Sequence, residues 1–183
     1  MSLKLSKINI INLLFYFIPI SYIAGNLVLN LNILFIIVLA VVFYSNEIFR
    51  LKLDIFDKLI ILFFSYILLT ALISVYSNFL VEDSKKDFTI LIKTLAFFRF
   101  LIFYFVIRFL INKEIINFKF FFIFCTTCTI FVCLDIIFQI YTGKDIFGYE
   151  LAFRRASGPF GSEVVAGSYL QRFSIFSFFL FYF

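Results

Sequence analysis

Long apolar runs constrain this chain more than any other feature of its sequence. A helix rises about 1.5 Å per residue, so roughly 20 apolar residues cross the ~30 Å hydrocarbon core of a bilayer. Six such runs follow one another, at residues 8–24, 27–45, 59–76, 89–111, 120–141 and 168–183. The last run is too short to cross and has no polar exit. The sequence therefore predicts an all-α polytopic membrane protein with five full transmembrane helices and the start of a sixth.

The composition excludes an ordinary soluble domain. The 183 residues are 64% hydrophobic and 15% charged, whereas soluble domains average about 45–50% apolar and about 25% charged. The net charge of +5 comes from basic residues scattered among loops and helix ends. Such residues contact anionic lipid headgroups, so we expect membrane lipid as a partner and no nucleic acid.

The first and last runs bear on the domain organisation. Small residues at Ala24 and Gly25 make a cleaved signal peptide the alternative for the first run. Five further runs favour a retained span, in which Pro19 is expected to introduce a kink. Because the last run is incomplete, we expect residues 1–183 to form one transmembrane domain that is the truncated N-terminal part of a larger protein.

Basic residues also predict the orientation. Eight Lys and Arg residues fall on the side of the N-terminus and six on the other side. Cytoplasmic ends carry the excess of positive charge. The sequence therefore predicts a cytoplasmic N-terminus and places the loop at residues 143–167 on the outer side of the membrane, in the periplasm if the cell has two membranes.

This loop interrupts the apolar pattern with glycine, proline and two adjacent arginines, Arg154 and Arg155. Dense glycine and proline shape turns. The planar guanidinium fork matches phosphate oxygens, so both arginines are candidates to bind the diphosphate of a lipid-linked substrate. The alternative is that they contact lipid headgroups, or pair with Glu150 and Glu163.

Four further residues are expected to support this site. Backbone N–H groups of a glycine-rich turn approach an anion closely, which gives a supporting role to Ser157, Gly158 and Gly161. Glu163 either orients Arg155 or accepts a proton, and an ordinary salt bridge is favoured. No catalytic residue is assigned.

Two ionisable residues lie within the predicted spans. Arg99 is about ten residues inside its span, where a charge costs at least about 2.5 kcal/mol and a paired or functional role is the default. Asp135 is its expected partner, and Gln139 shares a helix face with Asp135 because the two are four residues apart. A substrate path and a purely structural interhelical clamp are equally supported.

Metal and cofactor chemistry is not expected. The chain has no histidine, and its three cysteines, Cys125, Cys128 and Cys133, share one apolar run. Metal sites place cysteine pairs on polar knuckles with further ligands elsewhere. Buried free thiols are the better interpretation, with no disulfide.

Three short motifs resemble the O-antigen ligase and O-antigen polymerase superfamily of bacterial surface-polysaccharide assembly. They are D-I-F-G at 145–148, R-A-S-G-P-F-G-S-E at 155–163 and G-S-Y-L at 167–170. The resemblance covers the whole chain in layout and about thirty residues in detail. It implies a fold of about a dozen helices, with a later periplasmic loop that supplies another arginine and a histidine.

The resemblance also implies a function in lipopolysaccharide biosynthesis at a bacterial inner (plasma) membrane, with the loop on the periplasmic side. Family members are membrane glycosyltransferases that move a glycan from undecaprenyl diphosphate to lipid A core or to a growing polysaccharide. Arg155 matches the arginine that binds the substrate diphosphate, with Arg154 as the second choice. A membrane transporter or lipid flippase is the alternative, because Arg99 and Asp135 are ionisable groups within the membrane. A non-catalytic membrane fragment is the third interpretation.

Overall fold

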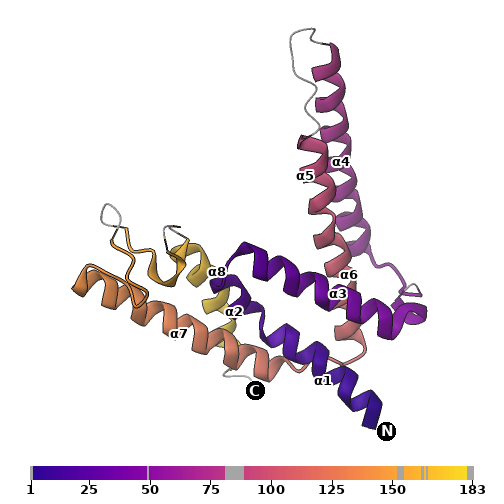
Figure 1. Ribbon diagram of the computed structural model, residues 1–183. Coiled ribbons are helices and arrows are strands. Elements are labelled where there is room, and N and C mark those ends of the chain that lie inside the picture. Colours follow the sequence, from indigo (N-terminus) through magenta and orange to yellow (C-terminus); the bar gives the residue numbers. More distant parts are fainter. Residues whose placement is uncertain are drawn as a thin grey trace. The chain divides into compact units, whose positions relative to one another are not determined.

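The chain is helical throughout most of its length (Figure 1). The computed structural model describes residues 2–48, 50–80, 89–151, 155–161, 163 and 165–180. None of these described residues forms a β-strand, which confirms the all-α class. The helices are α1 (Ser2–Tyr16), α2 (Ile18–Ile23), α3 (Asn26–Ile48), α4 (Ile55–Leu80), α5 (Thr89–Phe97), α6 (Arg99–Asn112), α7 (Phe118–Thr142), the 3-10 turn η1 (Gly158–Phe160) and α8 (Ala166–Phe179).

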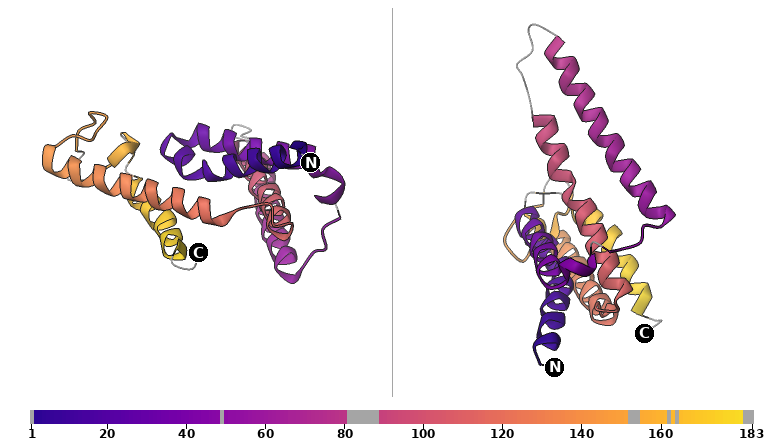
Figure 2. Two further views of the ribbon diagram at one scale, coloured as in Figure 1. Left: turned by 90° about the horizontal axis from the view of Figure 1, so that it is seen from below. Right: turned by 90° about the vertical axis from the view of Figure 1, so that its right-hand side faces the viewer.

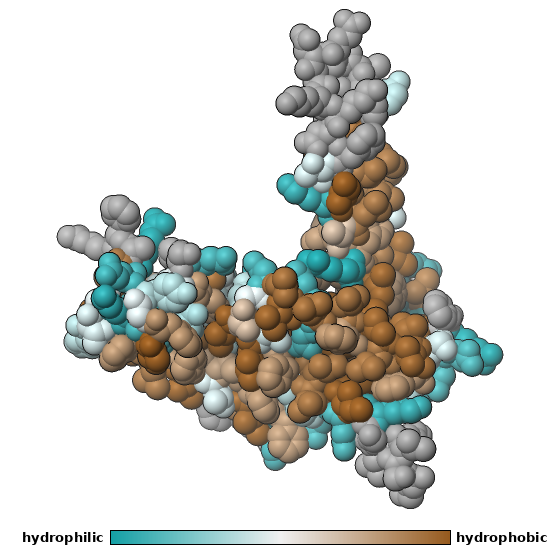
Figure 3. Space-filling model, in the orientation of Figure 1, coloured by the Kyte–Doolittle hydropathy of each residue, from teal (hydrophilic) through white to brown (hydrophobic). Residues whose placement is uncertain are grey.

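Four helical segments among the described residues are long and apolar enough to cross a membrane. They are Asn26–Ile48, Ile55–Ser77, Thr89–Asn112 and Phe118–Thr142, of 23, 23, 24 and 25 residues. Large apolar side chains cover much of their surface (Figure 3); on α4, for example, Leu62 and Ile73 are 67% and 66% exposed. A hydrocarbon solvent accepts such a surface and water does not.

The prediction of five full spans and a sixth is therefore wrong in number. The run at 8–24 is not one helix: α1 ends at Tyr16 and α2 begins at Ile18. Pro19 lies at the start of α2, where its ring lacks an N–H and crowds the carbonyl four residues earlier. Neither piece alone spans a bilayer. At the other end, the 14 residues of α8 cover about 21 Å, short of the ~30 Å that crossing requires.

The chain divides into two compact units, Met1–Ile36 with Glu114–Phe183, and Ile37–Lys113. In the first unit α7 is the central helix, and α8, α1, α2 and η1 pack against it. Its buried face repeats at spacings of three and four residues, as a helix requires. This face consists of Phe121, Phe122, Cys125, Cys128, Thr129, Val132, Asp135 and Gln139. Aromatic rings fill much of the contact, as between Phe15 and Phe121, whose centroids are 4.5 Å apart.

In the second unit α4 lies beside α5 and α6, as the right-hand view of Figure 2 shows. A cluster of charged residues joins the start of α4 to the last part of α6. Asp57 is fully buried and forms an ion pair with Arg108. It also accepts hydrogen bonds from the Tyr104 hydroxyl at 3.0 Å and from the Asp54 N–H at 2.6 Å. Arg108 reaches the Asp54 carboxylate as well, at 2.5 Å. Every oxygen of Asp57 is thereby compensated, which its burial demands.

We predict that Asp57→Ala destabilises the protein strongly, because it leaves the largely buried guanidinium of Arg108 without its main counter-charge. Breaking a buried pair from one side costs about 3–5 kcal/mol. The free energy of unfolding, measured by circular dichroism in mixed micelles of increasing denaturing-detergent content, tests this.

Asp54→Ala is the matched control. It removes the other carboxylate that Arg108 contacts, but this side chain is 70% exposed, and exposed pairs contribute about 1 kcal/mol or less. Equal losses for the two variants would contradict the structural role assigned to Asp57.

Candidate functional site

The candidate site begins where α7 ends. Gly143 adopts φ = 81°, in the left-handed region that favours glycine, and its N–H donates to the Gln139 carbonyl at 2.9 Å. This is the usual way for a helix to terminate and reverse the chain. Beyond it, Lys144 and Glu150 form an antiparallel bridge and an ion pair. The loop is thereby folded back over the C-terminal end of α7 (Figure 1).

Gln139 fixes the loop to α7 by its side-chain amide. Its Oε1 accepts the N–H of Gly158 at 2.9 Å, while its Nε2 donates to the Ser157 hydroxyl and to the Tyr149 carbonyl, both at 3.3 Å. Gln139 is fully buried and Ser157 is 2% exposed. These bonds therefore satisfy polar groups that have no water to replace them.

Asp135, one helical turn earlier, makes a second connection. Its carboxylate Oδ1 accepts the N–H of Ile146 at 2.9 Å. The loop backbone also packs closely here: a Cβ on Gly158, whose φ is +56°, would lie 3.1 Å from the Ile136 side chain and 3.8 Å from Asp135 Oδ2. The backbone conformation favours glycine at this position, and any Cβ would need the Ile136 side chain to shift.

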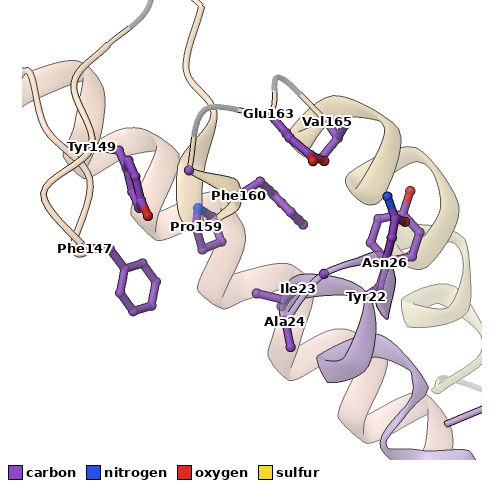
Figure 4. A pocket seen from close by; sticks show the side chains of 12 residues that line it. Tyr22, Ile23, Ala24, Asn26, Phe147, Tyr149, Pro159, Phe160, Glu163 and Val165 are labelled. Atoms are coloured by element: carbon purple, nitrogen blue, oxygen red, sulfur yellow. The ribbon is translucent and has the colours of Figure 1, made fainter. Parts of the chain in front are cut away.

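Next to this anchored loop lies a pocket of about 560 Å³. Figure 4 shows Phe147 and Tyr149 on one side, the turn between α2 and α3 on the other, and Pro159, Phe160 and Glu163 between them. The lining combines four aromatic rings with the Asn26 amide and one carboxylate, that of Glu163. Its residues are Tyr22, Ile23, Ala24, Gly25, Asn26, Phe147, Tyr149, Pro159, Phe160, Gly161, Glu163 and Val165.

Tyr22 brings a cation to the edge of this pocket. Arg172, on α8, donates a 2.6 Å hydrogen bond from Nη1 to the Tyr22 hydroxyl oxygen, and its guanidinium carbon lies 5.5 Å from the centroid of the Tyr22 ring. The ring itself packs against Phe160, Tyr169 and Phe173. The guanidinium keeps further donors to offer, since it has five N–H groups in all.

This arrangement suits a ligand with hydroxyl groups and apolar ring faces. Aromatic side chains pack on such faces, and carboxylate and amide oxygens accept hydrogen bonds from hydroxyls. Glu163 is the one charged group among the described lining residues, so an anion would be repelled from the pocket itself. Arg155 and Arg172 are exposed cations that do not line the pocket. An anionic part of the ligand would be accommodated beside these two arginines, outside the pocket.

The predicted loop residues are divided between these features. Ser157 and Gly158 belong to the anchoring bonds, whereas Gly161 and Glu163 line the pocket. Among the described residues no ion pair joins Glu163 to Arg155. Arg154 lies outside the described residues, so its role in diphosphate binding stays a prediction.

The predicted pairing of Arg99 with Asp135 also stays a prediction, because the two residues belong to different units. Asp135 has a partner within its own unit, the Ile146 N–H. Arg99 begins α6, directly after Phe98, whose backbone angles remain helical. Its guanidinium lies 4.8 Å from the Phe100 ring centroid, which is close enough for a cation–π contact.

Sequence reasoning missed Tyr22, Asn26 and Arg172. Their only signal in the sequence is weak: Arg172 is a charge at the start of an apolar run, and Asn26 follows a glycine. Tyr22 and Arg172 are 150 positions apart, and no local pattern predicts a contact of that range.

Comparisons with protein-family models, with curated proteins and with solved structures found no match. Within the part of the chain that the structure describes, no group of three or more His, Cys, Asp or Glu side chains is placed to hold a metal ion. Cys125, Cys128 and Cys133 are free thiols. The assignment of the site therefore depends on the geometry of the pocket and its loop.

We predict that Gln139→Ala releases the loop, because the buried N–H of Gly158 loses its acceptor. An unsatisfied buried donor costs about 1–3 kcal/mol, which corresponds to roughly 5- to 150-fold faster amide exchange around Gly158. Hydrogen exchange followed by mass spectrometry measures this directly.

Thr127→Ala is the control on the same helix. The Thr127 hydroxyl is exposed and bonds the Ile123 carbonyl of its own helix, so its removal should leave the loop unchanged. Equal exchange at residues 155–161 in the wild type and the Gln139 variant would show that the side chain does not hold the loop.

Proposed function

We propose that the protein is a membrane glycosyltransferase of the O-antigen ligase and polymerase type, which moves a glycan from undecaprenyl diphosphate to lipid A core or to a growing polysaccharide. The observation that carries the proposal is the pocket beside the glycine-rich loop. Its aromatic rings, its carboxylate and its amide fit a sugar. Two exposed arginines fit a diphosphate: Arg155 precedes the lining residues of the loop in the sequence, and Arg172 contacts Tyr22 of the lining. The motifs of residues 145–170 add their resemblance to that superfamily.

In this proposal the two ends of the substrate are bound by different groups. A sugar ring packs against Tyr149 and Phe160, and Glu163 accepts a hydrogen bond from one of its hydroxyls. Arg155 binds the diphosphate, and Arg172, positioned by Tyr22, is a further cation for it. Separate sites for the neutral and anionic parts follow from the negative charge of Glu163, which would repel the diphosphate.

The reaction is a substitution at the anomeric carbon. The acceptor hydroxyl forms a new C–O bond and loses its proton, while the bond from the anomeric carbon to the diphosphate oxygen breaks. Negative charge grows on the leaving diphosphate in the transition state. Fixed cations lower the barrier because they interact more strongly with this charge than with the ground-state substrate. Arg155 has this role, with the loop on the periplasmic face of a bacterial inner membrane and the N-terminus in the cytoplasm.

We predict that Arg155→Ala lowers the rate of glycan transfer about 10²–10³-fold, the range found when one electrostatic stabiliser is removed. The assay uses the complete protein in proteoliposomes with undecaprenyl-diphosphate-linked glycan and acceptor, and transfer is read on a gel. Glu163→Gln keeps the size of the side chain but weakens the acceptor, and should raise KM for the sugar donor.

Lys144→Ala provides the matched control for Arg155. Lys144 is a cation of the same loop, but its ammonium pairs with Glu150 at 3.2 Å and both side chains are largely exposed. The backbone bridge to Glu150 is retained in this variant, so transfer should persist. A full rate in the Arg155 variant would overturn its assignment. No transfer by the wild-type protein, together with no binding of undecaprenyl diphosphate, would overturn the function itself.

A transporter or flippase is the second candidate, favoured by the position of Arg99. This residue lies near the middle of the 24-residue segment Thr89–Asn112. Ionisable groups within the membrane commonly mark substrate or ion pathways. If this function holds, Arg99→Gln abolishes flux of a fluorescent lipid-linked substrate across proteoliposomes while Arg155→Ala does not. No flux by the wild-type protein, together with glycan transfer that Arg155→Ala lowers, supports the transferase.

A further inference from the structure

One end of the second unit has more cations than its carboxylates can pair. Glu47 forms an ion pair with Lys113, and Asp54 and Asp57 both pair with Arg108. Nearby, three exposed basic residues are present: Arg50, Lys52 and Lys58. Among the described residues none of these three takes part in an ion pair. This end therefore carries uncompensated positive charge next to the spans.

An apolar pocket lies at the same end. It has a volume of about 420 Å³ and is lined by residues with apolar side chains from α3, α4, α6 and the link between α3 and α4. Leu51 and Leu53 of that link line the pocket, while Lys52 between them is exposed. Arg108 holds the link in place, since its guanidinium donates to the Lys52 carbonyl at 3.3 Å.

We propose that this pocket and its cations form a binding site for one anionic phospholipid. An acyl chain occupies the apolar pocket, and the phosphate and headgroup contact Arg50 and Lys52, with Lys58 close by in sequence. Charge complementarity favours this occupant over a zwitterionic lipid, which offers no net charge to the cations. This end of the second unit also lies on the side of the membrane that the sequence predicts to be cytoplasmic, where anionic lipids attract basic residues next to spans. The site does not depend on the proposed glycan transfer.

The test is native mass spectrometry of the complete, delipidated protein incubated with phosphatidylglycerol and phosphatidylcholine of matched chains. We expect the wild type to retain phosphatidylglycerol in preference. Each basic residue near an anionic headgroup favours binding about fivefold, so Arg50→Gln with Lys52→Gln should remove most of the preference. Lys119→Gln, an exposed cation at the start of α7, is the control and should retain it.

A second variant tests the pocket separately from the charge. Val41→Phe fills part of the lining and should reduce retention of both lipids. Equal retention of the two lipids by the wild type would overturn the proposal, as would a preference that survives the double variant. Undecaprenyl phosphate displacing phosphatidylglycerol would assign the pocket to an isoprenoid instead. A dimer without lipid adducts, lost in Val41→Phe, would assign it to a second copy of the chain.

Discussion

The hydrogen bonds of the Gln139 side chain determine where the rest of the candidate site lies. One amide, fully buried at the last turn of α7, satisfies a backbone donor, a hydroxyl and a backbone carbonyl from two different parts of the loop. Because no water replaces these bonds, the loop has one stable position against the helix. Phe160 and Glu163 come shortly after Gly158 in the chain and line the pocket. The position of the loop therefore also determines the position of this wall of the pocket.

The same requirement explains the polar groups elsewhere in this apolar chain. The buried carboxylate of Asp57 is compensated by an ion pair with Arg108 and by hydrogen bonds from a tyrosine hydroxyl and a backbone N–H. Asn12 donates to the Ile115 carbonyl and accepts the Asn117 N–H, so it closes the link that precedes α7. In each case a polar side chain compensates backbone groups where helices end, which is where a membrane protein has groups left unpaired.

The periodic features of this fold could be predicted from the sequence, and its long-range features could not. Runs of apolar residues gave four spans within a few residues, because hydrocarbon thickness sets helix length. The run at 8–24 is divided into α1 and α2 next to Pro19; the proline indicates a kink, but hydropathy alone counts the run as one span. In the site, glycine density predicted the loop, and the i,i+4 spacing placed Asp135 and Gln139 on one face. The contacts of that face with Gly158 and Ile146, and those of Tyr22 with Arg172, depend on tertiary packing.

The contact between Tyr22 and Arg172 has a consequence for biogenesis. The two residues are 150 positions apart, and ribosomes add about 5–20 residues per second. Tyr22 and the turn after it therefore emerge roughly 8–30 s before the arginine that completes their environment. During this interval half of a polar, aromatic pocket is present in a nascent chain with no partner. Insertion factors that shield such half-formed surfaces would act on the first helices of this protein, well before α7 and α8 are made.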